Sequence, residues 1–163
     1  MRKINLFIFL SALIIGLAGC KQDDIFNAAE QALIDDAAIV AYLEDLDIFD
    51  EAIKDEDSGL YYIIIEEGSG AKPTFGSSVI THYSGYFLSG QLFDTSLETP
   101  GPFDFVLGRG DVIAGWERGF TLIEKGTRAL FLIPSGLAYG NNGSTGIPPN
   151  TVLQFDTHLI DVR

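Results

Sequence analysis

Residues 111–120, DVIAGWERGF, are the stretch around which the rest of the chain is organised. The stretch contains Trp116, the only tryptophan of the chain, directly after a glycine. Trp116 and Phe120 are four positions apart, so a short helix would place both rings on one face. Val112 and Ile113 precede this helix and would point into the same space. Taken alone, such an aromatic helix start is more often part of a core than of a binding site.

Other aromatic and acidic residues lie next to turn signals that could return them to this helix. They are Tyr83, Phe93, Asp94, Phe103, Phe105, Tyr139 and Phe155. If they converge on Trp116, a pocket is favoured over a plain core.

Alternating patterns rich in β-branched and aromatic residues predict strands on both sides of the short helix. They cover residues 60–65, 79–88, 91–95, 103–107, 127–133 and 151–162. Gly85 predicts a bulge or bend in the second strand, and Ser89-Gly90 predicts a hairpin turn. The predicted fold class is therefore α+β, with an antiparallel sheet of five to six strands covered by one short helix.

A second, longer helix is predicted upstream of the sheet, at residues 26–46, where no Pro or Gly interrupts the pattern. Its apolar stripe is predicted to consist of Leu33, Val40 and Leu43, with Ile39 and Leu46 close to it. The acidic residues, which fall mostly elsewhere, are Glu30, Asp35, Asp36, Glu44 and Asp45. The stripe needs a cover, either this chain's own domain or a second copy. We expect the first, because a single helix of this length is marginal alone, and a monomer is favoured over a dimer.

The N-terminus predicts an export signal with a lipid attachment site. Arg2 and Lys3 precede an apolar run of about 15 residues, shorter than the ~20 that span a bilayer. Residues 17–20, LAGC, resemble the bacterial lipobox, which is cleaved before its cysteine and carries lipid on it. We predict a lipoprotein signal peptide at residues 1–19 and lipid attachment at Cys20. An ordinary signal peptide or an uncleaved anchor is the alternative.

The predicted mature chain is acidic and has one cysteine. Loss of Arg2 and Lys3 would lower the net charge from −13 by two, to −15. This charge argues against nucleic acid as a partner, and against membrane contact other than through the lipid. With Cys20 as the only cysteine, no disulfide can form within the chain. Lys21 rather than an aspartate follows Cys20, which favours the outer membrane and leaves open whether its periplasmic or surface face displays the domain.

Metal and cofactor signatures are absent from the sequence. The two histidines, His82 and His158, lie in strand patterns, and there is no HExxH, CxxC or clustered His/Cys set. There is also no GxSxG elbow and no GxxxxGK[ST] loop. We therefore predict neither a metal site nor a cofactor.

Eight short motifs follow one another along the chain. They are His82-Tyr83-Ser84-Gly85, Phe93-Asp94, Phe103-Asp104-Phe105, VIAGWE at 112–117, Ile133-Pro134, Ala138-Tyr139-Gly140, IPPN at 147–150 and LQFD at 153–156. In this order and spacing they resemble the FKBP-type peptidyl-prolyl cis-trans isomerases, over about residues 59–163. The N-terminal helix and anchor look like those of exported bacterial members, so the chain resembles a bacterial lipoprotein member of the family. We predict three segments: signal peptide 1–19, lipid-anchored acidic helix and linker 20–58, and isomerase domain 59–163.

The resemblance implies a curved antiparallel sheet wrapped around the short helix, with a pocket between them. It implies substrate-binding roles for Phe93, Phe103, Val112, Trp116 and Phe155, with Trp116 as the floor. It implies catalytic roles for Tyr83, Asp94, Tyr139 and the backbone amide of Ile113. Phe105, Phe120 and Phe131 are expected to be plain core.

The function that the resemblance implies is acceleration of X-Pro bond rotation in exported or envelope proteins, without a covalent intermediate. The implied partners are proline-containing unfolded or nascent exported polypeptides, and macrolides of the FK-binding class. Leu137 and residues 140–147 depart from the family pattern at the pocket rim, which bears on sequence preference and macrolide affinity. The alternatives are a non-catalytic binding module or holdase chaperone anchored in the envelope, and a purely structural envelope protein.

Overall fold

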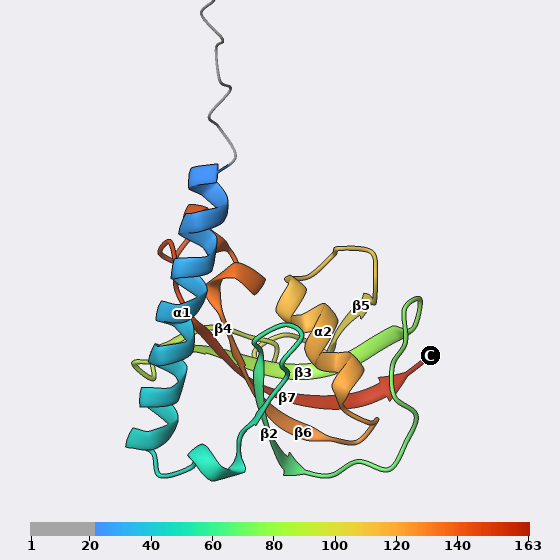
Figure 1. Cartoon of the computed structure of the whole chain (residues 1–163). Coiled ribbons are helices and arrows are strands. Elements are labelled where there is room, and N and C mark those ends of the chain that lie inside the picture. The colour runs from blue at the N-terminus through green and yellow to red at the C-terminus, as the bar shows by residue number, and fades with distance from the viewer. Residues whose placement is uncertain (1–21) are drawn as a thin grey trace, which may run out of the picture.

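The computed structural model describes residues 22–163, so the predicted signal peptide and Cys20 lie outside the described residues. Residues 22–163 form two α-helices, α1 (Gln22–Asp45) and α2 (Ala114–Leu122). The strands are β1 (Ile53–Lys54), β2 (Tyr61–Glu66), β3 (Ser78–Phe87), β4 (Leu92–Thr95), β5 (Phe103–Val106), β6 (Arg128–Ile133) and β7 (Leu153–Val162) (Figure 1). The predicted α+β class is confirmed. The sheet has seven strands rather than five to six because the two-residue β1 extends one edge.

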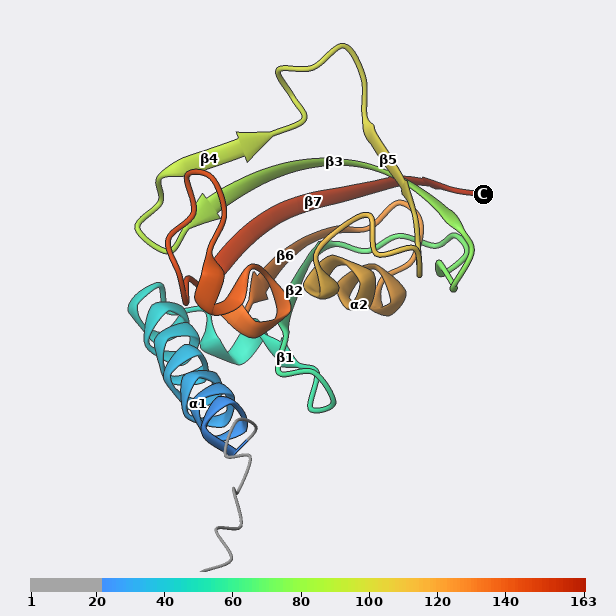
Figure 2. The same cartoon turned by 90° about the horizontal axis from the view of Figure 1, so that it is seen from above.

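All strand pairs are antiparallel and form one sheet in the order β1-β2-β6-β7-β3-β4, with β5 pairing the other half of β3. The register between β3 and β4 shifts between Gly85 and Tyr86, which confirms the predicted bulge. A bulge increases the local bend and twist of a strand. The sheet curves around α2, so that its concave face covers the helix (Figure 2).

The main core lies between α2 and the concave face. Trp116 and Phe120 are 4% and 0% exposed, so the predicted shared face of the short helix is confirmed. On β7, alternate residues form one buried face: Leu153, Phe155, Thr157 and Leu159. Phe105, Phe120 and Phe131 are buried core residues, as expected. A Cβ added at Gly115 would collide with the side chain of Ile133, so this glycine lets α2 lie close to β6.

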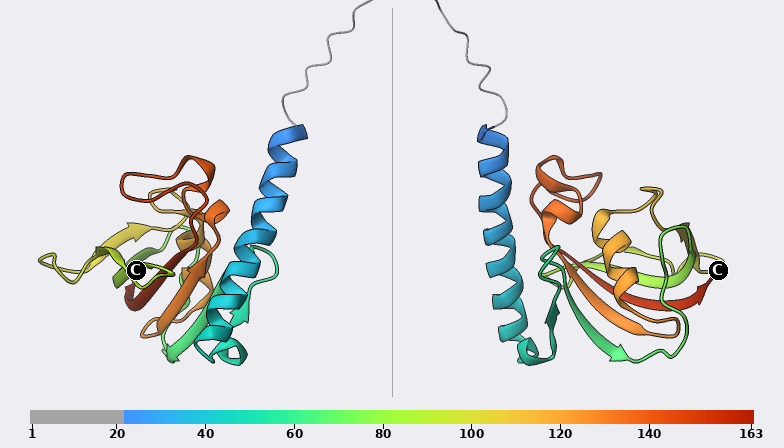
Figure 3. Two further views of the ribbon diagram at one scale, coloured as in Figure 1. Left: turned by 90° about the vertical axis from the view of Figure 1, so that its left-hand side faces the viewer. Right: turned by 45° about the vertical axis from the view of Figure 1, so that its right-hand side comes forward.

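A second, smaller core lies on the other face of the sheet, where α1 packs. Ile39 and Leu43 of the helix are fully buried against Tyr61, Ile63 and Leu132 of β2 and β6. The prediction that the helix packs on its own domain is therefore confirmed. Figure 3 shows α1 alongside the domain, with its C-terminal half next to the sheet and its N-terminal half reaching beyond it.

The predicted stripe of α1 was wrong at both ends. Leu33 and Leu46 are 73% and 47% exposed, whereas Asp35 is 2% exposed. Asp35, Ile39 and Leu43 are four residues apart, so they form the face that meets the domain. Leu33 precedes Asp35 by two residues, about 200° around a helix at ~100° per residue, so it lies on the side turned away from the domain. Within residues 22–163, no helix combines the length and the apolarity needed to cross a bilayer.

One ion pair links α2 to the segment between β1 and β2. Arg118 donates two hydrogen bonds to Asp55, Nε to Oδ2 at 2.8 Å and Nη2 to Oδ1 at 2.5 Å. The Asp55 side chain is 10% exposed and that of Arg118 is 38% exposed. The Arg118 hydrogen bonds outweigh the opposing effect of burial and, with help from Ser58, lower the pKa of Asp55 to about 2.

This pair predicts a stability that depends on acid pH. Because the folded-state pKa of Asp55 is depressed, its contribution is complete above the unfolded value of about 3.9 and is lost as the pH falls towards 2. We expect Arg118→Met to reduce the free energy of unfolding by about 1 kcal/mol at neutral pH, since exposure screens the pair. Urea unfolding from pH 2 to 7 should show the two proteins converging at the acid end. A constant difference across this range would contradict the assignment.

Candidate active site

A pocket of about 230 Å³ opens between α2 and the concave face of the sheet. It is lined by Tyr83, Phe93, Asp94, Phe103, Asp111, Val112, Ile113, Trp116, Tyr139 and Phe155. The structure thus brings together all nine site residues that were predicted within the described part of the chain. Asp111 was missed, although it directly precedes Val112 in the motif. The catalytic and binding roles of these residues remain predictions.

Trp116 is the floor of the pocket, and aromatic side chains surround it edge to face. The centroid of its ring lies 4.8 Å from that of Tyr83 and 5.2 Å from that of Phe155, at interplanar angles of 83° and 79°. Phe93 stands against Phe155 at 5.6 Å. Edge-to-face pairs at these distances are favourable beyond the area they bury, so these contacts hold the walls of the pocket against its floor. The indole N–H of Trp116 is buried and has no hydrogen-bond partner among residues 22–163.

Tyr83 and Asp94 form the polar pair of the pocket. The phenol of Tyr83 on β3 donates to Oδ2 of Asp94 on β4 at 2.7 Å. Burial, and then the hydrogen bond and charge of Asp94, raise the pKa of Tyr83 above its ordinary value. The phenol therefore stays protonated and donates its hydrogen bond to Asp94. The carboxylate of Asp94 thereby orients the ring of Tyr83.

Two hydrogen-bond donors at the pocket are free to meet a ligand. Ile113 is the N-cap residue of α2, and its carbonyl accepts from Trp116 and Glu117. Its own N–H makes no hydrogen bond within the described part of the chain. Tyr139 lies at the rim with 38% of its surface exposed, and its hydroxyl has no partner in residues 22–163. Both groups can donate hydrogen bonds to carbonyl oxygens of a bound peptide.

Glu117 fixes the loop that leads into the pocket, a role that sequence reasoning missed. Its Oε2 and Oε1 accept from the backbone N–H groups of Gly108 and Gly110, at 2.6 and 3.1 Å. Both glycines have positive φ, a backbone conformation that favours glycine. The acidic residue after Trp116 in the motif was the available signal. Its contacts set the path of the chain into Val112 and Ile113.

Gly85 leaves space for the pocket wall, which gives a testable consequence. A Cβ at this position would lie 2.7 Å from Cζ of Phe93 and 2.9 Å from Cε1 of Phe155. We expect Gly85→Ala to push both rings into the pocket and to reduce binding of its ligand by about tenfold, as overpacking of 1–3 kcal/mol implies. Gly101→Ala is the matched control, because a Cβ there meets nothing within 4 Å. Equal affinities of the two variants, measured by calorimetry, would argue against this wall.

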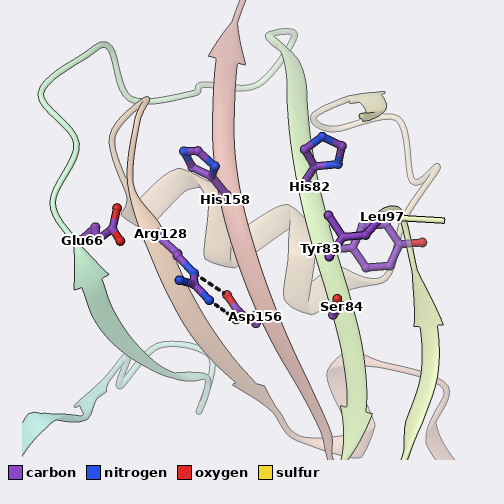
Figure 4. Close-up of a pocket in the computed structure, with 8 residues that line it drawn as sticks. All are labelled: Glu66, His82, Tyr83, Ser84, Leu97, Arg128, Asp156 and His158. Carbon is purple, nitrogen blue, oxygen red and sulfur yellow. Dashed lines mark hydrogen bonds and ion pairs between the residues drawn. The ribbon is translucent and has the colours of Figure 1, made fainter. Parts of the chain in front are cut away.

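A second hollow, of about 330 Å³, lies on the face of the sheet turned away from α2. Figure 4 shows its lining: Glu66, His82, Tyr83, Ser84, Leu97, Arg128, Asp156 and His158. The guanidinium of Arg128 is paired with Asp156, at 3.1 and 2.7 Å, so its charge is already neutralised. In the residues that the structure describes, no three His, Cys, Asp or Glu side chains are grouped to hold a metal ion. The aromatic pocket is therefore the better candidate site.

Comparison with known proteins points to one family. A family model described as FKBP-type peptidyl-prolyl cis-trans isomerase matches residues 69–160. The FKBP-type peptidyl-prolyl cis-trans isomerase FkpA of Escherichia coli strain K12 is 39% identical over 114 residues, which are 70% of this chain and 42% of FkpA. FK506-binding protein 1 of Dictyostelium discoideum is 40% identical over 106 residues, which are 64% of this chain and 99% of that protein.

Comparison of the structure with solved structures points to the same family. The crystal structure of FkpA from Escherichia coli is similar with a TM-score of 0.70 and 34% sequence identity, over 85% of this chain and 64% of that one. The chain therefore spans less than half of the FkpA sequence and about two thirds of its crystallised chain.

Proposed function

Because the chain belongs to the family of FKBP-type peptidyl-prolyl cis-trans isomerases, we propose that its aromatic pocket accelerates rotation about X-Pro peptide bonds. The observation that carries this proposal is the pocket itself, with a tryptophan floor, aromatic walls and two free donors at its rim. Its volume of about 230 Å³ suits one small ring and the bonds next to it. A larger ligand, such as a macrolide, would remain partly outside.

The reaction needs no bond to be made or broken. Amide resonance keeps the X-Pro bond planar behind a barrier of ~18–20 kcal/mol. At the twisted point this resonance is lost and the charge separation of the carbonyl falls. The twisted bond therefore tolerates an apolar environment better than the planar bond does. A pocket that stabilises the twisted form more than the ground state is a catalyst.

The residues of the pocket have separate tasks in this mechanism. The proline ring lies over Trp116, between Phe155 and the other aromatic walls, which excludes water and sets the axis of rotation. The Ile113 amide and the Tyr139 hydroxyl donate to carbonyl groups on the two sides of the rotating bond. Asp94 orients Tyr83 and takes no proton.

The required acceleration is modest by enzymatic standards. Uncatalysed X-Pro rotation takes tens to hundreds of seconds. Reaching milliseconds requires about 10⁴-fold, or roughly 5.5 kcal/mol. Positioning and exclusion of water together can supply this amount. The proposal therefore invokes neither a nucleophile, a metal nor a cofactor.

Tyr139→Phe tests the proposal. Removing one neutral hydrogen bond to the substrate costs about 1 kcal/mol, so we expect kcat/KM for a short X-Pro peptide to fall about fivefold to tenfold. Stability should not change, because Tyr139 is exposed. Tyr86→Phe is the matched control, since Tyr86 is half-buried and does not line the pocket. If the wild-type chain gives no acceleration while folded, the proposed activity is wrong.

We also propose that the chain is a lipoprotein of the cell envelope, with clients among proline-containing unfolded or nascent exported polypeptides. The support is the leader and the LAGC sequence at residues 17–20, together with the acidic composition. The outer membrane is the favoured location, because Lys21 follows Cys20. The segments remain 1–19 for the signal peptide, 20–58 for the anchored helix and linker, and 59–163 for the isomerase domain. Incorporation of labelled fatty acid that persists in Cys20→Ser would contradict the anchor.

The alternative function is a binding module or holdase that grips unfolded chains without accelerating rotation. Leu33 and Ile34 favour it, because these side chains on α1 are 73% and 55% exposed and could bind apolar segments. Suppression of client aggregation that survives Tyr139→Phe and is lost in Leu33→Ser would support this reading. FK506-binding protein 1 of Dictyostelium discoideum is named for binding FK506. We propose macrolide binding for this chain too, with competition against the X-Pro peptide as its test.

A further inference from the structure

Asp35 of α1 is a buried carboxylate that the mechanism above does not use. Only 2% of its surface is exposed. Its Oδ2 accepts from the backbone N–H of Ser135 at 2.7 Å and from the Ser135 hydroxyl at 2.6 Å. Its Oδ1 accepts from Gln31 at 2.8 Å. Because a buried carboxylate is costly unless donors surround it, the contact between helix and domain at this point is specific.

Ser135 stands at the base of the segment that carries Tyr139. We call residues 134–142 the strap; it contains the 3-10 turns η2 (Ser135–Leu137) and η3 (Gly140–Asn142). Pro134 gives η2 no side-chain cap. The first N–H of η2 is instead satisfied by Asp35, a hundred residues earlier in the chain. This end of the strap is therefore fixed by α1.

The other end of the strap is fixed by its own loop. The backbone N–H of Asn150 donates to the carbonyl of Gly140 at 2.8 Å, and that of Gly143 donates to the carbonyl of Tyr139 at 3.2 Å. Tyr139 therefore lies between two anchored points. It has no side-chain hydrogen bond of its own in the described part of the chain, so its position is set by the strap.

A hollow lies behind the strap. It has a volume of about 500 Å³ and is enclosed by α1 and the strap, with Gln31, Asp35, Ser135, Leu137 and Gly140 among its lining. Asp35 and Ser135, which contact each other, both lie in the wall of this hollow. The hollow leaves space between the strap and α1, and the Asp35 contact with Ser135 bridges the two elements beside it.

We propose that Asp35 is a positioning residue, which acts on the active site through Ser135 and the strap and keeps the Tyr139 hydroxyl at the pocket rim. The inference rests on the proposed isomerase function and deepens it. A donor that is already in place need not be ordered while the substrate bond twists, so the cost of ordering is removed from the reaction. In this reading α1 is a structural part of the active site as well as the link to the N-terminus.

A double-mutant cycle on the full chain tests the inference. We expect Asp35→Ala to lower kcat/KM for a short X-Pro peptide about fivefold, and Tyr139→Phe about tenfold. Because both changes remove the same donor, the double variant should lose about tenfold rather than about fiftyfold. Asp35→Asn, which retains an acceptor for Ser135, should recover most of the activity. A loss of about fiftyfold, or no loss in Asp35→Ala, would overturn the inference.

Two controls separate positioning from a general effect on folding. Asp36→Ala removes the neighbouring carboxylate, which accepts from Lys54 at 2.7 Å and from Tyr61 at 2.8 Å, and it should change kcat/KM less than twofold. If Asp35→Ala does not fold, Ser135→Ala removes the hydroxyl alone and takes its place in the cycle with the same expected non-additivity. If the wild-type chain shows no turnover, the proposed isomerase function is refuted. This outcome is distinct from failure of the positioning role of Asp35, which requires an active wild-type chain.

Discussion

Trp116→Leu should lower kcat/KM for a short X-Pro peptide about 30-fold to 100-fold, the largest loss of activity that we expect from a single substitution. Leucine keeps the floor of the pocket apolar but removes the flat surface over which the proline ring would turn. Since Trp116 is 4% exposed and contacts Tyr83 and Phe155, the change also leaves a cavity. We expect the free energy of unfolding to fall by about 2–3 kcal/mol.

The matched control is Phe120→Leu, one turn further along α2. Phe120 is fully buried beneath Trp116, with ring centroids 5.4 Å apart, and does not line the pocket. Its replacement should cost a similar amount of stability and less than threefold in kcat/KM. Steady-state kinetics with urea unfolding on both proteins separates activity from stability. Equal losses of activity would mean that Trp116 acts only as a core residue.

Leu43→Asp should give the largest loss of stability, about 3–5 kcal/mol. Leu43 is fully buried where α1 meets the sheet, and a charge placed there has no partner. We expect the helix to leave the domain, which urea unfolding and hydrogen exchange of α1 would detect. Leu33→Asp, on the same helix and 73% exposed, should change stability by less than about 0.5 kcal/mol. Equal effects of the two substitutions would contradict the described packing of α1.

The concave side of the fold follows from local patterns in the sequence. The i, i+4 spacing of Trp116 and Phe120 predicts their common burial, and alternation along β7 predicts the buried face that includes Phe155. These patterns work because each element meets one continuous apolar surface. The residues of the pocket were predicted from the motifs and their order along the chain. Helix and strand periodicity alone would not have identified them.

The face of α1 could not be derived in the same way. Helical periodicity identifies a stripe, but it does not say which edge of the stripe meets the domain. Leu33 therefore fitted the stripe and yet is exposed, whereas Asp35 was placed with the solvated acids and is buried. Its partner Ser135 is a hundred residues away in a loop. A contact of this kind depends on tertiary geometry and leaves no local signal.

In the proposed mechanism, a dry aromatic pocket accelerates rotation of the X-Pro bond without proton transfer or covalent chemistry. Exchange spectroscopy by NMR on a short X-Pro peptide, with the wild-type chain present in catalytic amounts, measures this directly in H₂O and in D₂O. We expect cis-trans exchange of the bound peptide to be about 10⁴-fold faster than that of the free peptide, at the same rate in both solvents. Absence of acceleration by the folded chain, or a clear slowing in D₂O, would contradict it.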